Sequence, residues 1–501
     1  MKNDILQDAL SHISDKHIAE AAAPKKRRYT PYIGAIAACL ILVITLGIAL
    51  PKSSIPPVME NPQNIHPGNI PTTTPNPVAI PDVVYADKLL ASPVLPEMVV
   101  YPLNQENWQQ WREQEDAWRL CRLALHDAPD GYADSLVDFW MQSIPIYLAD
   151  NGGSNAVYSP ISLYMALSML AQTTGGQSQQ EILDLLGADS MEDLATQAEL
   201  VFKNQYENDG VHTSILANSL WLDDDYVFNQ NAATELAKTF YASVYQGALE
   251  TPEMNIALKD WLNAQTGGLL EDSIYNLDGM DELTALVIAS TINYRCKWLD
   301  GFNADKNTQD IFYGANGEQT VTFMHKANET GGYVWGENFT ATSVALDDDS
   351  RMWLILPDEG HTPEDLLLNG NALDMIFSKT NPNKQSLIVN LSVPKFDISG
   401  DLDLIAGLQK MGLTQVFDCE KADFSGICAY DQGVYLGSAQ QGVRVSIDED
   451  GLTGVAYTIL EAPGKGMPTG EEVDFVLDRP FLFVVESGDG LPLFTGIVNR
   501  P

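Results

Sequence analysis

With 501 residues, of which 45% are hydrophobic, the chain is long enough for one large domain with additional segments. Acidic residues outnumber basic ones by 68 to 28, and the resulting net charge of −40 argues against nucleic acid or anionic lipid as a partner. Five cysteines are too few for a disulfide-stabilised secreted scaffold, so a hydrophobic core must hold the fold.

The first predicted element is a transmembrane helix. Residues 32–50 are nineteen residues without a charge, and as a helix they would extend about 28 Å, close to the hydrocarbon thickness of a bilayer. A basic cluster at residues 25–28 precedes them, so the positive-inside rule places residues 1–31 in the cytoplasm and the rest outside the cell. A cleaved signal peptide is the alternative, although its apolar core is usually shorter. We therefore expect a single-pass protein of the cell membrane.

A proline-rich extracellular stalk is predicted for residues 51–100, followed by a helical lead-in at residues 101–130. Proline fixes φ and removes a hydrogen-bond donor, so this composition favours an extended, polyproline-like segment. In the lead-in, Trp108, Trp111 and Trp118 recur at helical spacing. We interpret them as one face of a helix that docks on the next domain, and a ligand-binding platform is the alternative.

Residues 131–501 are predicted to form one α+β domain. Residues 161–170 and 179–186 have the apolar patterns of helices, whereas residues 344–356 and 385–393 have strand character. Helices come first and strands dominate later, which favours an α+β fold over a regularly alternating α/β sheet.

No catalytic motif is visible in the sequence. It contains no H-E-x-x-H pair, G-x-S-x-G elbow, P-loop or G-x-G-x-x-G segment. The aspartate runs at residues 223–225 and 347–349 are interpreted as solvated turns, because no twelve-residue calcium loop surrounds them. We therefore expect no enzyme activity, no cofactor and no metal site.

Seven segments resemble, in order and spacing, the motifs of one known family. They are residues 155–162 (NAVYSPIS), 217–221 (ANSLW), 261–268 (WLNAQTGG), 293–298 (NYRCKW), 393–396 (VPKF), 408–417 (LQKMGLTQVF) and the closing segment 479–501. On these motifs the domain is similar to the serpins, which are loop-baited inhibitors of serine proteases.

The resemblance implies a serpin-like fold with a large central β-sheet, two smaller sheets, eight or nine helices and an exposed reactive-centre loop. It also implies a mechanism in which a protease cuts the loop and is trapped as its acyl-enzyme while the loop inserts into the central sheet. Ser159, Ser162 and Trp298 match the family's shutter and central-sheet positions.

The reactive loop is expected to begin at a hinge. Glu449 and Gly451 match the family's E-x-G hinge start, and from there every second residue faces into the sheet on insertion. These inward residues are Leu452, Gly454, Ala456 and Thr458. Sixteen residues after Glu449 the chain reaches Lys465, so the predicted reactive bond is Lys465–Gly466. A lysine there points to a trypsin-like protease.

Three departures from the family pattern bear on this mechanism. Leu452 stands where inhibitory serpins usually have threonine, Ser290 replaces an asparagine, and Gln441 is followed by glycine instead of lysine. The predicted function is nevertheless that of a monomeric inhibitor of extracellular serine proteases. A non-inhibitory serpin that binds a partner at the cell surface is the main alternative, and a stalk-and-head structural protein is another.

Overall fold

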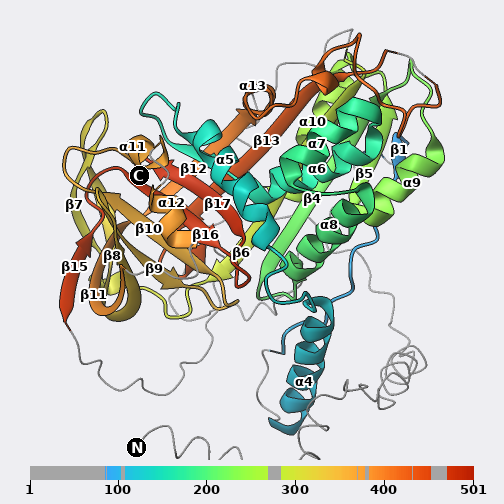
Figure 1. Cartoon of the computed structure of the whole chain (residues 1–501). Helices are drawn as coiled ribbons and strands as arrows, with labels where there is room; N and C mark the ends of the chain where they lie inside the picture. Colours follow the sequence, from blue (N-terminus) through green and yellow to red (C-terminus); the bar gives the residue numbers. More distant parts are fainter. Residues whose placement is uncertain are drawn as a thin grey trace, which may run out of the picture. The chain divides into compact units, whose positions relative to one another are not determined.

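The computed structural model describes residues 85, 87–102, 108–268, 284–368, 371–377, 383–430, 433–452 and 471–501. The predicted cytoplasmic segment, the predicted transmembrane helix and the stalk up to residue 84 lie outside these residues. No helix within the described ranges is both long and apolar enough to cross a bilayer. The described part is an α+β structure with ten α-helices and two large sheets. Figure 1 shows how these elements are arranged.

The first sheet has eight strands in the order β1-β5-β4-β6-β14-β13-β12, with β3 paired to β4. Their bounds are β1 Leu89–Ala91, β3 Glu207–Asn208, β4 Thr213–Asp223, β5 Ala242–Gly247, β6 Leu286–Lys297, β12 Phe396–Asp403, β13 Leu436–Ile447 and β14 Gly451–Leu452. Strand β6 lies at its centre, which explains why nearly every residue in it is buried.

The second sheet has nine strands in the order β15-β11-β8-β9-β10-β16-β17-β2, with β7 paired to β8. Their bounds are β2 Ala156–Tyr158, β7 Thr308–Gly314, β8 Gly317–Trp335, β9 Phe339–Ala345, β10 Arg351–Pro357, β11 Lys384–Pro394, β15 Glu472–Val476, β16 Phe481–Glu486 and β17 Pro492–Val498. The expectation of two separate smaller sheets is therefore wrong for the described residues. Strand β8 is long enough to pair with β7 and β11 along its length and with β9 at its end, so it joins both groups of strands.

Nine of the ten described α-helices follow Gly131, within the expected range. The helices are α4 Trp108–Leu125, α5 Val137–Leu148, α6 Pro160–Thr173, α7 Gly176–Leu186, α8 Met191–Gln205, α9 Gln230–Thr239, α10 Pro252–Gln265, α11 Pro363–Leu368, α12 Asn371–Phe377 and α13 Ile405–Lys410. The expected helices at residues 161–170 and 179–186 are confirmed as α6 and α7. The expected strand at residues 344–356 divides into β9 and β10 around a turn at Asp347–Asp349.

Helix α6 begins with a side-chain cap. Pro160 occupies the first turn, and the Ser159 side chain accepts a hydrogen bond from the backbone N–H of Ser162. Almost every residue of α6 is buried, because the helix packs against β6 of one sheet and β17 of the other. The opposite face of the eight-stranded sheet is covered by α10, whose Trp261 and Leu258 belong to a second hydrophobic cluster with Trp221 of β4. Both faces of the sheet are therefore covered by helices.

The predicted stalk differs from the structure at its C-terminal end. Residues 89–91 form β1, which pairs with β5 in the eight-stranded sheet. The segment from Val83 to Ser92 lacks proline, so its N–H donors are available for strand pairing, and Leu89 and Leu90 are partly buried against the core. The chain from β1 onward thus belongs to the folded domain.

Candidate functional site

The candidate site is the seam between β6 and β13 at the centre of the eight-stranded sheet. The two strands pair directly, and in parallel, from Leu436 opposite Leu286 to Gln441 opposite Ser290. At the other end of the seam the short strand β14 lies between them, with Leu452 paired both to Ile447 of β13 and to Cys296 of β6. No register pair joins the two strands directly between these ends, over residues 291–295 and 442–446, all of which are described.

Side chains hold the directly paired end of the seam to helix α6. The amide of Gln441 accepts a hydrogen bond from the Ser159 backbone N–H and donates one to the Ser159 carbonyl, each at 2.9 Å. On the facing strand, the Ser290 hydroxyl donates to the Ser162 carbonyl at 2.9 Å. We call Ser159, Ser162, Ser290 and Gln441 the latch. All four are buried, so breaking the latch would leave polar groups without partners.

Ser159 also ties the latch to the second sheet. Its hydroxyl donates to the Leu493 carbonyl at the start of β17, at 2.8 Å, and lies 2.9 Å from the Ser162 hydroxyl. Movement of β6 relative to β13 at this end therefore affects α6 and both sheets.

A tight turn forms the other end of the seam. The Asp448 carboxylate accepts hydrogen bonds from the backbone N–H groups of Asp450 and Gly451, at 2.9 and 3.1 Å, which closes the turn between β13 and β14. Trp298 covers this turn: its indole N–H donates to the Asp448 carbonyl at 2.8 Å, and its backbone N–H donates to the Asp450 carbonyl at 3.0 Å. Trp298 is buried, so the turn is fixed from the side of β6.

Glu449 is held at the turn by two polar side chains. The Lys395 ammonium lies 2.6 Å from its carboxylate, and the Asn307 amide also donates to it. Burial raises the pKa of Glu449, but the hydrogen bonds from Lys395 and Asn307 outweigh this and leave the pKa below its ordinary value. Glu449 is therefore ionised at neutral pH.

Gly451 permits the close approach of β14 to β6. A Cβ atom at this position would lie 2.2 Å from the Cys296 carbonyl oxygen and 2.7 Å from the Lys297 Cα. A larger residue would push β14 out of the seam. The next residue, Leu452, is buried between β6 and β13.

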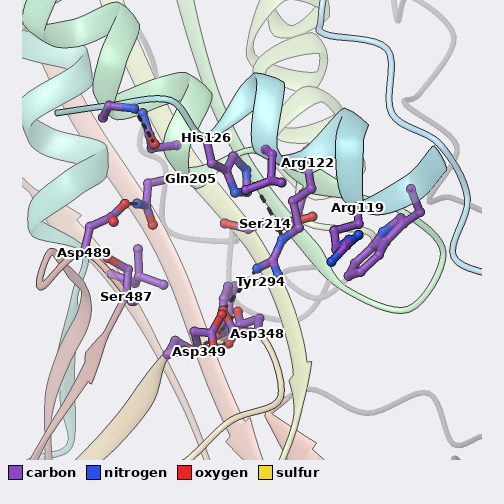
Figure 2. Close-up of a pocket in the computed structure, with 18 of the residues that line it drawn as sticks. Arg119, Arg122, His126, Gln205, Ser214, Tyr294, Asp348, Asp349, Ser487 and Asp489 are labelled. Carbon is purple, nitrogen blue, oxygen red and sulfur yellow. Dashed lines mark hydrogen bonds and ion pairs between the residues drawn. The ribbon is translucent and has the colours of Figure 1, made fainter. Parts of the chain in front are cut away.

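Helix α4 lies against β3 and the turn between β9 and β10, beside a cavity of about 550 Å³ that is shown in Figure 2. Arg122 of α4 reaches the buried carboxylate of Glu207 at 2.5 Å and donates to the Asp348 carbonyl at 3.2 Å. The Trp118 indole donates to Asp209 at 2.9 Å. Trp118 and Arg122 therefore contact the domain, whereas Trp108 is exposed and the Trp111 indole donates to the Pro102 carbonyl, so the three tryptophans do not form one docking face. Burial raises the pKa of Glu207 to about 7, although Arg122 opposes the shift.

The structure brings together many of the site residues expected from the sequence. Ser159 and Ser162 lie in the latch, while Trp298, Glu449, Gly451 and Leu452 surround the turn at the opposite end. The remaining hinge residues Gly454, Ala456 and Thr458, and the predicted reactive bond Lys465–Gly466, lie outside the described residues.

Several contributors were not identified as site residues from the sequence. Gln441 and Ser290 were noted only as departures from the family pattern, yet both bind α6 in the latch. Lys395 was noted only as part of a motif, and the ion pair with Glu449 gives that motif a role. Asn307 carries no local signal, because only the fold brings it to the turn.

Comparison with known proteins agrees with this geometry. Residues 136–501 match the family model described as "Serpin (serine protease inhibitor)". Serpin-Z2B of Triticum aestivum is 27% identical over 364 residues, covering 70% of this chain and 90% of the relative. Plasminogen activator inhibitor 1 of Sus scrofa is 26% identical over 365 residues, covering 69% of this chain and 87% of the relative.

Two solved structures show the same fold. The native state of the thermophilic serpin tengpin has a TM-score of 0.66 and 22% identity, and the match covers 75% of this chain and 95% of tengpin. The native stressed conformation of Arabidopsis AtSerpin1 has a TM-score of 0.63 and 21% identity, with coverage of 75% and 100%.

Proposed function

The chain belongs to the serpin family, and on this premise we propose that it inhibits extracellular serine proteases as a one-use substrate. Members of the family are protease inhibitors and not enzymes, in agreement with the expectation from the sequence. The protease serine would attack the carbonyl carbon of the bait residue, form an ester with it and release the amine of the next residue. Insertion of the freed loop would then distort the protease before water can hydrolyse the ester.

The observation that carries this proposal is the position of β14. Leu452 already pairs with both neighbouring strands, while the strands beyond it are not directly paired until Gln441 and Ser290. Continued insertion after Leu452 would extend β14 along the seam and end at the latch. The backbone groups of residues 291–295 and 442–446 would then gain ladder partners from the loop.

The proposed bait bond is Lys465–Gly466, and the proposed target is a trypsin-like protease, since such enzymes bind a basic side chain in a pocket with a carboxylate at its base. The name of the Sus scrofa relative identifies an inhibitor of plasminogen activator, and we extend to this chain the general activity of protease inhibition. We propose that the inhibitor acts as a monomer.

The proposed location is the outer face of a cell membrane. The uncharged run at residues 32–50, preceded by the basic cluster, supports a single transmembrane helix with residues 1–31 in the cytoplasm. The proline-rich residues 51–84 would serve as the stalk. Protease added to intact cells should then reach the domain, which should remain in the membrane fraction. Recovery of a soluble form that begins near Pro51 would show that residues 32–50 are a cleaved signal peptide.

The decisive experiment is incubation of the full-length protein, in detergent, with trypsin, followed by a denaturing gel. We expect a covalent complex that survives boiling and a released fragment that begins at Gly466. Lys465→Ala should abolish the complex with trypsin. Inhibition of trypsin that survives this change, or a fragment that begins elsewhere, would overturn the assignment of the bond.

A matched pair of hinge variants tests insertion separately from recognition. Gly454→Arg would bury an unpaired charge in the sheet, so it should turn the inhibitor into a substrate that is cleaved without forming a complex. Thr453→Arg is the control, because this position faces solvent after insertion and should preserve inhibition. Equal inhibition by both variants would refute the proposed register.

The alternative function, a non-inhibitory serpin that binds a partner at the cell surface, is favoured by one observation. Leu452 is a bulky buried residue at the first inward hinge position, where inhibitory relatives usually have the smaller threonine. Cleavage of the loop by trypsin and elastase without any covalent complex would support this alternative.

A further inference from the structure

Three potential metal ligands converge beside the hinge. His212 lies just before β4, Cys296 near the end of β6, and Asp347 in the turn between β9 and β10. The imidazole Nε2 of His212 is 3.2 Å from the Asp347 Oδ1, and the Cys296 Sγ is 3.1 Å from the same oxygen. All three ligand atoms lie within 4.8 Å of one another.

The three groups are buried to an extent that is unusual for a polar cluster. His212 and Cys296 are 6% and 4% exposed, and the Asp347 side chain is 16% exposed. Within the described residues, Nε2 of His212 makes no hydrogen bond of acceptable geometry, although Asp347 is within ion-pair distance. The buried Nε2 thus faces the Asp347 carboxylate without a well-aligned hydrogen bond, and the Cys296 Sγ lies within 4.8 Å of it.

The surroundings orient the imidazole as they do in metal sites. Its Nδ1 lies 3.1 Å from the fully buried carboxylate of Asp209, which also accepts hydrogen bonds from the His212 backbone N–H at 2.7 Å and from the Trp118 indole at 2.9 Å. A carboxylate on the far nitrogen fixes the ring and directs the other nitrogen toward the metal. Asp347 is fixed in turn by the Lys297 backbone N–H, at 3.2 Å.

We propose that His212, Cys296 and Asp347 form a Zn²⁺ site. Bonds of about 2.0 Å to nitrogen and oxygen and about 2.3 Å to sulfur, in tetrahedral geometry, separate ligand atoms by roughly 3.3–3.5 Å, close to the two distances observed. Nitrogen, thiolate and carboxylate together suit zinc better than calcium or magnesium, which prefer oxygen ligands alone. Water takes the fourth position.

Zinc replaces protons at this site. Without metal, the imidazole lies between the carboxylates of Asp209 and Asp347. Zn²⁺ binds a neutral imidazole nitrogen and a thiolate, so metal binding releases protons from the site.

The proposed zinc site lies next to the hinge. Cys296 is the residue of β6 that pairs with Leu452, and the neighbouring Lys297 pairs with Gly451. Zinc would fasten this end of β6 to the start of β4 and to the turn between β9 and β10. If the proposed inhibitory function holds, the metal would set how easily the seam opens, but metal binding itself does not depend on that function.

The site can be tested without any protease. Full-length protein in detergent, stripped of metal and loaded with one equivalent of Co²⁺, should show the near-ultraviolet thiolate-to-cobalt charge-transfer band and visible bands of tetrahedral cobalt. Titration of Zn²⁺ should abolish both and should raise the melting temperature, because Zn²⁺ binds only the native arrangement. X-ray absorption at the zinc edge should find one sulfur and the remaining ligands nitrogen or oxygen.

Variants identify the ligands. Cys296→Ser should remove the charge-transfer band, and His212→Gln or Asp347→Asn should weaken Zn²⁺ binding by about 100-fold or more. Cys428→Ser is the matched control and should change none of these readings. Absence of the charge-transfer band in the unchanged protein, a band that persists in Cys296→Ser, or a zinc edge without sulfur would overturn the proposal and leave a proton-bridged cluster. The spectra of the unchanged protein decide the question even if a variant fails to fold.

Discussion

The two ends of the seam between β6 and β13 are stabilised in different ways. At the latch, the strands pair directly, and Gln441 and Ser290 hydrogen-bond to the first residues of α6. At the hinge, a two-residue strand separates them, and the contacts that hold it come from a turn, from Trp298 and from Glu449. On the proposed mechanism, the inserted strand would therefore grow from the hinge end, and the latch would open last.

The largest expected effect comes from removing the constraint at the hinge end. Cleavage within residues 459–469 would free the loop to extend β14. Completing the strand would add about ten ladder hydrogen bonds at about 1 kcal/mol each, so the melting temperature should rise by on the order of 20 °C. Differential scanning calorimetry of intact and cleanly cleaved protein measures this. An unchanged melting temperature would mean that the two ends of the seam do not differ in the way proposed.

The next largest effect is expected at the latch. Gln441→Ala would leave the buried Ser159 N–H without its partner and the Ser159 carbonyl with only the Leu163 N–H. The variant should therefore destabilise the uncleaved protein by about 1–3 kcal/mol. Gln440→Ala, at the adjacent and less buried position, is the control and should cost well under about 1 kcal/mol. Denaturant unfolding measures the loss of unfolding free energy in both variants. Equal losses would show that the latch does not contribute specially to stability.

A similar or smaller effect is expected when β14 is displaced from the seam. Gly451→Ala would place a Cβ against the Cys296 carbonyl, so β14 should leave the seam at a cost of about 1–3 kcal/mol. Hydrogen–deuterium exchange of the peptide that contains residues 447–452 should increase. Gly488→Ala, where the added atom meets only ordinary contacts of 3.4 Å or more, should leave that exchange unchanged; an equal rate in both variants would contradict the close approach at Gly451.

The smallest effect is a pH dependence beside α4. Glu207 has a pKa raised to about 7 by burial, against about 4.3 in an unfolded chain. Because the native state holds this proton more tightly than the unfolded chain, the contribution to stability is complete below about pH 4. It falls as the pH rises to about 7, and above that pH the stability no longer depends on Glu207. Glu207→Gln should remove most of this pH dependence, measured as the unfolding free energy between pH 5 and pH 8. A variant with the same pH profile as the unchanged protein would show that Glu207 is ionised throughout.

Much of the fold could be predicted because its signals are local. The helix at residues 161–170, the helical spacing of the tryptophans in α4 and the strand at residues 385–393 all follow from short-range patterns. The family motifs added the order of the elements and the position of the hinge.

The contacts that make up the site are not local, which is why they escaped prediction. Gln441 and Ser159 are 282 residues apart, and Glu449 and Asn307 are separated by 142. Asp347 was interpreted as part of a solvated turn, but the fold places it beside His212 and Cys296. The end of the stalk was placed too late, at residue 100, because the stalk was continued beyond the prolines that precede β1.

The two edge strands of the eight-stranded sheet determine whether a second molecule can add a strand there. One rim is covered by β1, so the chain itself occupies the hydrogen-bonding groups that a neighbouring molecule would seek. The other rim is β12, where Asp397, Asp401 and Asp403 are exposed and would repel another equally acidic molecule. Deletion of residues 89–91 would therefore expose β5 and should lead to self-association of the protein at high concentration.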